Sequence, residues 1–371
     1  DFSYHCQVVV GDYNYVFDPS VFLRRLFQRR DYSDWVLIID ETHNLYDRGL
    51  NYLSPSLKYE TVLTQIEQTG KFKNKVYQNI FKALLEVAEH FRALNEEGAI
   101  QFSGRQYFQT QLNPQAWIEA FEMYESTFIK YLIHKVRKKQ LIIDDPLEQL
   151  YYALRRFVQI ARYQERAFVP FYDANEGGVL KIQCCDPSGY LEQRLQGFHS
   201  VLAMSATLDP MPFYEDVLGF SNLAVQRLQL DSPFPAENRK VIIVPGISTR
   251  FKDRKNNYQK IAEVIEKTIA VKRGNYLAFF PSFDFLQNVN LFLGRVKLNK
   301  ILQKPGMSEQ ERDDILNHLK QKETGHLLLA VMGGVFSEGV DYSGQMAEGV
   351  FVVSPALPQI SFERELLKEY Y

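Results

Sequence analysis

Short apolar runs alternate with segments of helical period along the last third of the chain, and this alternation constrains the fold most. The runs are VIIVPG (241–246), YLAFFPS (276–282), ILQKP (301–305), HLLLAVM (326–332) and GVFVVSP (349–355). Helical segments lie between them, at about 256–272, 283–297 and 308–320. Because parallel strands need long crossover connections, this order predicts a parallel sheet covered by helices.

The first 48 residues have the same α/β character. VVV (8–10) is predicted to be a short buried strand, followed by a turn over 11–19 and a helix through VFLRRLFQ (21–28). WVLIID (35–40) is a continuous apolar run, which is typical of a parallel strand covered on both faces. Much later, VLAMSAT (201–207) predicts another buried strand.

The intervening region is mainly helical. Apolar residues recur at helical spacing over 75–94, 114–139 and 146–166, with charged residues on the opposite faces. Pro114 and Pro146 suit the first turns of their helices. FVPFYDA and VLKIQCC follow, joined by NEGG, and predict a hairpin of two strands.

Composition bounds the class of protein without naming a function. The chain has 371 residues, 46% of them hydrophobic and 24% charged, and its formal net charge is −2. This is ordinary globular composition, and the total charge does not indicate a nucleic-acid binder. The cysteines, Cys6, Cys184 and Cys185, have no zinc-ligand spacing, which indicates a reduced, intracellular protein. No apolar run approaches the roughly 18 residues of a membrane span.

An acidic pair, Asp40 and Glu41, stands at the end of the strand predicted at 35–40. Open α/β sheets bind ligands at the carboxyl ends of their strands. There Asp40 would hold Mg²⁺ and Glu41 would orient and deprotonate a water that attacks a phosphate, while His43 could report the nucleotide state to a neighbouring segment. The alternative is that the two acidic residues only favour the N-terminus of a helix.

Two further motifs follow strands. Ser205 and Thr207, in MSATLDP, offer hydroxyls to a neighbouring loop such as the one that holds His43, although they could simply cap a helix. In the glycine-rich segment 327–344, Gly339 lets the backbone approach a phosphate or ribose closely, and Glu338 and Asp341 add polar contacts.

Together and in this order, these motifs resemble the superfamily 2 helicases, specifically the XPD/DinG-like iron–sulphur branch. DETHNL resembles the DEAH box, with Thr42 in place of the usual Ala, and SATLDP resembles motif III. FFPSF (279–283) is similar to motif IV and GGVFSEGVDYSG to motif V. The segments VVVGDYNYVFDP, SPFPAENR, GISTRFKDR and SPALPQISFE are also similar to segments of the family.

The resemblance implies an α/β fold with two RecA-like motor domains, each built on a parallel sheet, the first interrupted by a mainly helical Arch-like insert. We expect the first motor domain at 1–48 and 166–231, the insert at 49–165 and the second motor domain at 232–371.

The same resemblance implies a DNA-repair type of helicase that uses ATP and Mg²⁺ to move 5′→3′ along single-stranded and forked DNA. Asp40, Glu41 and His43 would be catalytic, and Ser205, Thr207, Glu338, Gly339 and Asp341 would contact the nucleotide. The location would be intracellular, cytoplasmic or nucleoid-associated if the protein is bacterial.

Some family motifs are absent. No GxxxxGK[ST] loop for phosphates occurs, no four-cysteine site for a 4Fe–4S cluster is found, and the arginine-finger motif is missing. We therefore expect a fragment of a longer helicase, inactive alone, whose cluster ligands lie outside this chain. Two alternatives remain: an RNA-dependent ATPase, and a nucleic-acid-binding scaffold that has lost its ATPase activity. The basic run KVRKK (135–139) either lines a DNA passage or is a solvated helix end.

Overall fold

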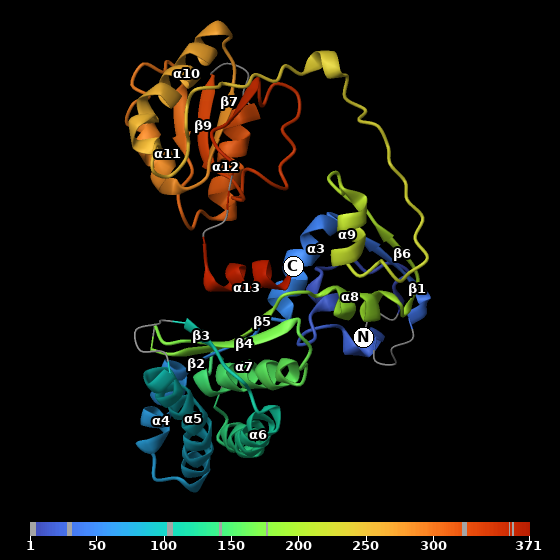
Figure 1. Ribbon diagram of the computed structural model, residues 1–371, viewed down its shortest axis with the longest axis vertical. Helices are drawn as coiled ribbons and strands as arrows, with labels where there is room; N and C mark the ends of the chain where they lie inside the picture. The colour runs from blue at the N-terminus through green and yellow to red at the C-terminus, as the bar shows by residue number, and fades with distance from the viewer. Residues whose placement is uncertain are drawn as a thin grey trace. The chain divides into compact units, whose positions relative to one another are not determined.

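The chain folds into two units in the computed structural model (Figure 1). The first comprises Asp1–Gln229 and Ile360–Tyr371, and the second comprises Leu230–Gln359. The structure describes residues 5–27, 32–101, 107–140, 143–175, 177–320, 325–355, 357 and 360–371.

Two parallel strands form the α/β part of the first unit. β1 (Tyr32–Ile39) pairs with β6 (Phe198–Ala203), so that Ile39 lies opposite Ala203. Because successive side chains of a strand point to opposite faces, Ile39 is buried in the core whereas Val36 and Ile38 are exposed. The expectation that this strand is covered on both faces is therefore wrong for the chain as described.

The helices around this sheet bury its other face. They are η2 (Thr42–Asn44), α3 (Leu45–Tyr52), α8 (Ser188–Leu195) and α9 (Met211–Val217). Leu45 of α3, Leu191 of α8 and Val217 of α9 pack with Ile39 in one apolar cluster. This cluster fixes the end of β1 relative to the helix that follows it.

The amino-terminal segment differs from its prediction. Residues 8–10 form no strand, and Val8 and Val10 are 75% and 92% exposed. An extended segment becomes a strand only when its backbone pairs with a neighbour, and this one pairs with no described strand. The predicted turn contains a short helix, α1 (Asn14–Phe17), whose Phe17 is buried. Of the helix predicted next, only α2 (Arg24–Phe27) forms. Residue 28 of that prediction lies outside the described residues.

The three long predicted helices are confirmed. They are α5 (Lys75–Gln101), α6 (Pro114–Arg137) and α7 (Pro146–Ala161), with the shorter α4 (Tyr59–Gly70) before them. Pro114 and Pro146 occupy the first turns of α6 and α7, and the side chain of the preceding Asn113 or Asp145 accepts a backbone hydrogen bond there. Among the described residues, no helix is both long enough and apolar enough to cross a membrane.

A four-stranded antiparallel sheet packs against these helices, in the order β2-β5-β4-β3. Its strands are β2 (Ser56–Lys58), β3 (Tyr107–Gln109), β4 (Phe168–Asp173) and β5 (Val179–Cys184). The predicted hairpin is β4–β5, but its side chains share one apolar core with α5, α6 and α7. The boundary expected after residue 165 therefore runs through a continuous core.

The last helix also belongs to the first unit. α13 (Phe362–Tyr370) packs beside the antiparallel sheet, where Phe362 contacts Tyr107 and Phe171. This differs from the expectation that residues 232–371 form a single domain. Apolar packing holds α13 against the sheet, because Leu366 of this helix is buried against Phe171 and Cys185.

The second unit contains a parallel sheet in the order β10-β7-β9-β8. The strands are β7 (Tyr276–Phe280), β8 (Asn299–Leu302), β9 (His326–Val331) and β10 (Gly349–Val352). The helices α10 (Tyr258–Val271) and α11 (Phe283–Asn290) pack on one face, and α12 (Glu309–Lys320) packs on the other. The predicted alternation is thereby confirmed.

One strand predicted in this region is wrong. VIIV (241–244) forms no strand, and Ile243 is 84% exposed. It lies in an extended segment that includes only the short turns η3 (Ala236–Asn238) and η4 (Arg254–Asn256). Apolar, β-branched sequence alone did not make a strand, since the segment pairs with no described neighbour.

Candidate active site

Asp40 and Glu41 stand immediately after β1, at the carboxyl end of the strand. Both residues are exposed, and one carboxylate oxygen of Asp40 accepts the backbone N–H of Glu41 at 2.9 Å. Glu41 has a φ of +46°, in the left-handed region that non-glycine residues rarely adopt. The turn therefore carries backbone strain at the residue proposed for catalysis, as functional positions often do.

Tyr13 holds this turn from the amino-terminal segment. Its hydroxyl donates to the carbonyl oxygens of Asp40 and Glu41, the latter at 3.0 Å. Burial, and then the nearby Asp40 and Glu41 carboxylates, raise the pKa of the Tyr13 phenol, so this group stays a donor at neutral pH. The sequence reasoning missed Tyr13, although this residue lies within the segment VVVGDYNYVFDP.

Parallel pairing brings the loop after β6 beside the loop after β1. The backbone pairing continues past the strands, because Met204 donates to the carbonyl of Ile39 and Thr42 donates to that of Met204, both at 3.0 Å. Two segments roughly 160 residues apart in sequence thus run together beyond the ends of their strands. The candidate residues at both strand ends consequently lie within hydrogen-bond reach.

His43, Ser205 and Glu41 form one polar cluster at this point. Nδ1 of His43 lies 2.7 Å from the Ser205 hydroxyl, which donates to Oε2 of Glu41 at 3.4 Å. The same nitrogen is 3.3 Å from Oε2 of Glu41. Thr207 donates its backbone N–H to Ser205 at 3.4 Å, while its side chain is exposed. The expected contact between His43 and the SAT loop is therefore present, and it also includes Glu41.

The glycine-rich segment belongs to the second unit and follows β9. Gly333 and Gly339 have φ values of +67° and +65°, which glycine adopts without steric cost. Glu338 and Asp341 are exposed on this loop.

Arg312 of α12 fixes the glycine-rich loop. Its guanidinium donates to the carbonyl oxygens of Val335 at 3.0 Å and Gly339 at 3.2 Å. No sequence signal pointed to this residue, because an arginine on an amphipathic helix usually lies on a solvated face.

The residues around Asp40 fit a magnesium ion held together with a nucleotide. Asp40 is exposed, and its second carboxylate oxygen receives no hydrogen bond from the residues that the structure describes. Within the same part of the chain, no group of three or more His, Cys, Asp or Glu side chains is arranged as a metal site. The open carboxylate oxygen of Asp40 suits Mg²⁺, which proteins commonly hold through one or two carboxylates, substrate phosphates and water.

Cys184 and Cys185 do not fit an iron–sulphur cluster. Cys184 and Cys185 are adjacent, buried and unbridged, and burial raises the pKa of both thiols, that of Cys185 to about 11. Cluster ligands are thiolates, which such burial disfavours. Neither residue is therefore assigned as a ligand of a cluster.

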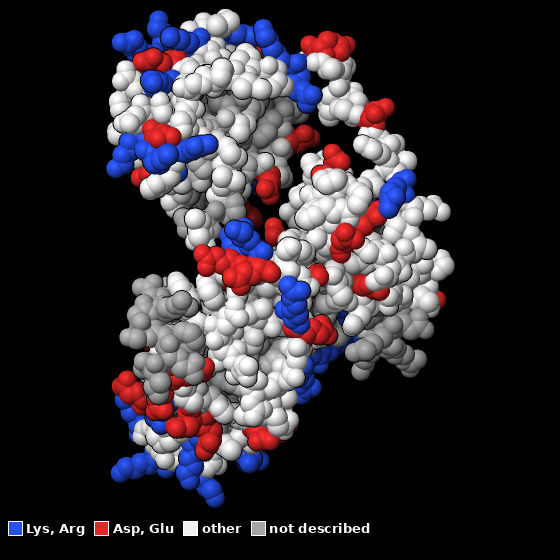
Figure 2. Space-filling model, in the orientation of Figure 1, with Lys and Arg blue, Asp and Glu red and all other residues white. Residues whose placement is uncertain are grey.

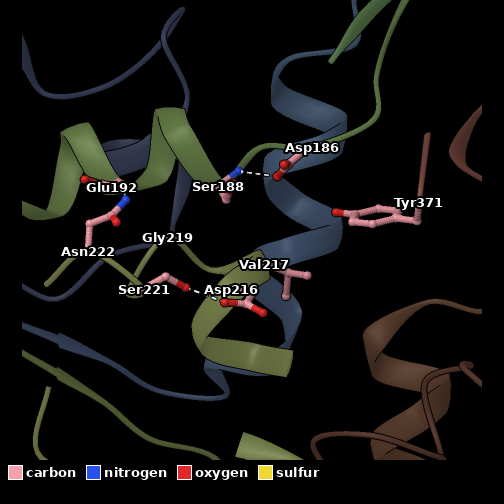
Figure 3. A pocket seen from close by; sticks show the side chains of 9 residues that line it. All are labelled: Asp186, Ser188, Glu192, Asp216, Val217, Gly219, Ser221, Asn222 and Tyr371. Carbon is pink, nitrogen blue, oxygen red and sulfur yellow. Dashed lines mark hydrogen bonds between the residues drawn. The ribbon is translucent and has the colours of Figure 1, made fainter. Parts of the chain in front are cut away.

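A separate open pocket of about 220 Å³ lies between α8, α9 and Tyr371 (Figure 3). Its carboxylates already have partners: Asp186 accepts from the backbone of Ser188, and Asp216 accepts from Ser221. The third, Glu192, accepts from Asn222 at 2.9 Å. None of the candidate residues lines this pocket, so it is not part of the site.

Comparison with known families gives two matches. The model of a helicase C-terminal domain matches residues 265–371, and the DEAD_2 model matches residues 2–62. The second match contains Asp40, Glu41 and His43, and the first contains the glycine-rich loop.

Curated relatives are similar over most of the chain. The ATP-dependent DNA helicase chl1 of Neosartorya fischeri is 25% identical, covering 88% of this chain and 43% of the relative. CHL1 of Debaryomyces hansenii is 26% identical, covering 90% of this chain and 46% of the relative. The chain therefore spans less than half the length of these relatives.

Solved structures show the fold. An XPD helicase structure covers 99% of this chain and 62% of its own, with a TM-score of 0.53 and 20% identity. The structure of Xpd4 from S. tokodaii covers 96% of this chain and 68% of its own, with a TM-score of 0.53 and 13% identity. The predicted α/β architecture of two RecA-like domains with parallel sheets is confirmed.

Proposed function

Because the chain belongs to the XPD/DinG-like superfamily 2 helicases, we propose that it supplies the DEAH box and much of the second motor domain of an ATP-dependent DNA helicase. The observation that carries this proposal is the cluster of Glu41, His43 and Ser205 at the carboxyl ends of two parallel strands. It joins the proposed hydrolytic carboxylate to the loop of motif III.

Each residue of the cluster has a chemical role in this proposal. Asp40 would hold Mg²⁺ together with the nucleotide, and the ion would neutralise the charge that develops on the phosphates. Glu41 orients the attacking water and takes its proton. Since Nδ1 of His43 contacts both Glu41 and Ser205, His43 links the hydrolytic carboxylate to the next loop. Release of the γ-phosphate then changes the hydrogen bonding of that loop.

The remaining candidate residues complete the nucleotide site. Ser205 and Thr207 respond to nucleotide state from the first motor domain, and Gly339, Glu338 and Asp341 contact the nucleotide from the second. Arg312 is a positioning residue, since it fixes the carbonyls of that glycine-rich loop. ATP hydrolysis would drive 5′→3′ movement on single-stranded DNA and opening of forks.

The helical region is proposed to be the Arch-like insert. Its shared core supports an insert that starts near residue 49 and continues through the β4–β5 hairpin to about Cys185. The first motor domain would then resume at α8.

The test is the substitution Glu41→Gln in the intact protein. The amide cannot accept a proton, so DNA-stimulated ATP turnover should fall by ~10²–10⁴-fold, the usual contribution of a general base. Nucleotide binding should persist, because glutamine keeps the size of the side chain. Glu60→Gln, on the exposed side of α4, is the matched control and should keep full turnover.

A second function has one observation in its favour. The chain contains no GxxxxGK[ST] loop, which agrees with a nucleic-acid-binding scaffold that does not hydrolyse ATP. DNA-stimulated hydrolysis by the intact protein would exclude the scaffold. Turnover of the Glu41→Gln variant equal to wild type would instead refute the role given to Glu41. An RNA-dependent ATPase is disfavoured by the long insert between the DEAH box and Ser205, and a comparison of DNA and RNA stimulation distinguishes the two.

A further inference from the structure

One end of the helical insert gathers cations from two separate segments. We call it the basic tip and define it as residues 71–75 (KFKNK), between α4 and α5, and 135–139 (KVRKK), at the end of α6. Neither segment contains a carboxylate. In Figure 2, Lys and Arg atoms collect at the lower end of the view, where Figure 1 has the α4–α5 loop.

Aromatic contacts bring the two segments together. Tyr77, in the first turns of α5, makes edge contacts with Tyr131 and His134 of α6, with ring centroids 5.6 Å and 6.3 Å apart. Phe72 stacks on Tyr77 at 4.4 Å with an interplanar angle of 24°. The start of α5 and the end of α6 therefore form one surface.

Most of these cations have no ion-pair partner. Lys71 pairs with Glu67, and Lys135 lies 3.7 Å from the buried Asp145. Within the described part of the chain, no carboxylate lies within ion-pair distance of the rest, which are all exposed: Lys73, Lys75, Arg137, Lys138 and Lys139.

Helix dipoles account for part of this charge, but not for all of it. Cations are favourable at the C-terminus of α6, where the helix dipole is negative, but unfavourable at the N-terminus of α5. Lys75 is the first residue of α5, and Lys73 precedes it by two positions. Lys71 and Lys73 follow the C-terminus of α4, where a cation is also favourable, so among the lysines of this loop only Lys75 stands where a helix dipole disfavours it.

Lys139 stands at a second position that is unfavourable for a lysine. Its φ is +55°, and the backbone of 139–140 donates to the carbonyls of Val136 and Lys135, both at 3.0 Å. These bonds form a Schellman motif, whose left-handed residue is usually glycine. A lysine here carries a charge at a position where glycine would be less strained.

We propose that the basic tip binds single-stranded nucleic acid. Phe72 is 49% exposed, and with one ring face on Tyr77 it is held in a fixed orientation for stacking on an unpaired base. The surrounding ammonium and guanidinium groups suit phosphates. That the bound strand is DNA rests on the proposed function. The strand would contact the insert at a place outside the motor domains.

The experiment measures the anisotropy of a labelled oligothymidylate titrated with the 371-residue chain at several salt concentrations. The fourfold alanine variant of Lys73, Lys75, Arg137 and Lys138 should bind at least about tenfold more weakly, because it removes the cations that neutralise phosphates. Removal of one phosphate contact lowers the slope of log affinity against log salt by about 0.7 for a single strand. The slope should consequently fall by roughly three.

Two further variants separate stacking and folding from charge. Phe72→Ala should weaken binding about tenfold without changing the salt slope, because it removes a stacking interaction. Lys139→Gly relieves the left-handed strain, so it should unfold at an equal or higher denaturant concentration and still bind more weakly. The double variant Lys58→Ala with Arg162→Ala removes two exposed cations outside the tip and should bind like wild type.

Other results would overturn the proposal. Unchanged affinity and slope in the fourfold variant, while the wild-type chain binds DNA, would refute the tip and leave the helicase proposal standing. Equal affinity for duplex DNA, or for a glutamate-rich peptide, would refute a single-strand site. Failure of the wild-type chain and of the intact protein to bind DNA would refute both proposals.

Discussion

Thr42 is fully buried beneath the DEAH-box turn, and its hydroxyl has no hydrogen-bond partner in the structure as described. A buried, unsatisfied hydroxyl costs free energy that an apolar group of the same shape does not. We predict that Thr42→Val raises the free energy of unfolding of the first unit by about 1 kcal/mol. Urea unfolding followed by tryptophan fluorescence measures this, because Trp35 and Trp117 both belong to that unit.

Thr69 provides the control for this substitution. It is buried to a similar degree, but its hydroxyl donates to the carbonyl of Gln65 at 2.6 Å. Thr69→Val should therefore lower the unfolding free energy, by about 0.5–1.5 kcal/mol. If Thr42→Val were as destabilising as Thr69→Val, the Thr42 hydroxyl would have a partner after all.

Among the elements, α13 docks onto the antiparallel sheet through a small set of contacts. Phe362 stacks on Tyr107 and meets Phe171 edge-on, with centroids 5.6 Å and 5.1 Å apart, and Lys181 pairs with Glu363 at 2.8 Å. We predict that Phe362→Ala increases amide hydrogen exchange of α13 by about tenfold, since each aromatic pair contributes roughly 0.5–1.5 kcal/mol. Hydrogen-exchange mass spectrometry of the C-terminal peptide provides the measurement.

Lys368→Ala is the matched change for that experiment, because Lys368 is exposed on the same helix. Its exchange should stay close to wild type. Reversing the ion pair gives a second check. Lys181→Glu alone should slightly increase the amide hydrogen exchange of α13, and adding Glu363→Lys should return the exchange to the wild-type level. Equal protection in wild type and Phe362→Ala would mean that α13 is held by other contacts.

For the molecule as a whole, we expect the given 371 residues to bind ATP poorly by themselves. The backbone and lysine of a P-loop supply most of the binding to the β- and γ-phosphates, and no GxxxxGK[ST] occurs among the 371 residues. We predict that the isolated chain gives no measurable heat of binding with micromolar ATP and unwinds no duplex. Micromolar affinity by isothermal titration calorimetry would show that other residues bind the phosphates.

Local sequence was sufficient to predict those features whose residue pattern and chemistry lie within one segment of the chain. Proline in the first turn and apolar helical spacing predicted α6 and α7, and the same spacing predicted α5, because capping and burial act within a single helix. The acidic pair Asp40–Glu41 at the end of the strand predicted at 35–40 predicted the candidate site, since strand ends of parallel sheets collect ligands. The family resemblance rested on the same motifs.

Tertiary structure decided what depends on partners distant in sequence. VVV (8–10) and VIIV (241–244) have the composition of strands but pair with no described neighbour, because a strand exists only through its pairing. The β4–β5 hairpin was predictable, whereas its place in the core of the insert was not. Tyr13 and Arg312 act through hydrogen bonds to backbone carbonyls, which no sequence pattern encodes. The sequence by itself determined which residues we propose for the chemistry. Only the fold decided which other residues hold them in place, since this depends on distances between segments far apart in the chain.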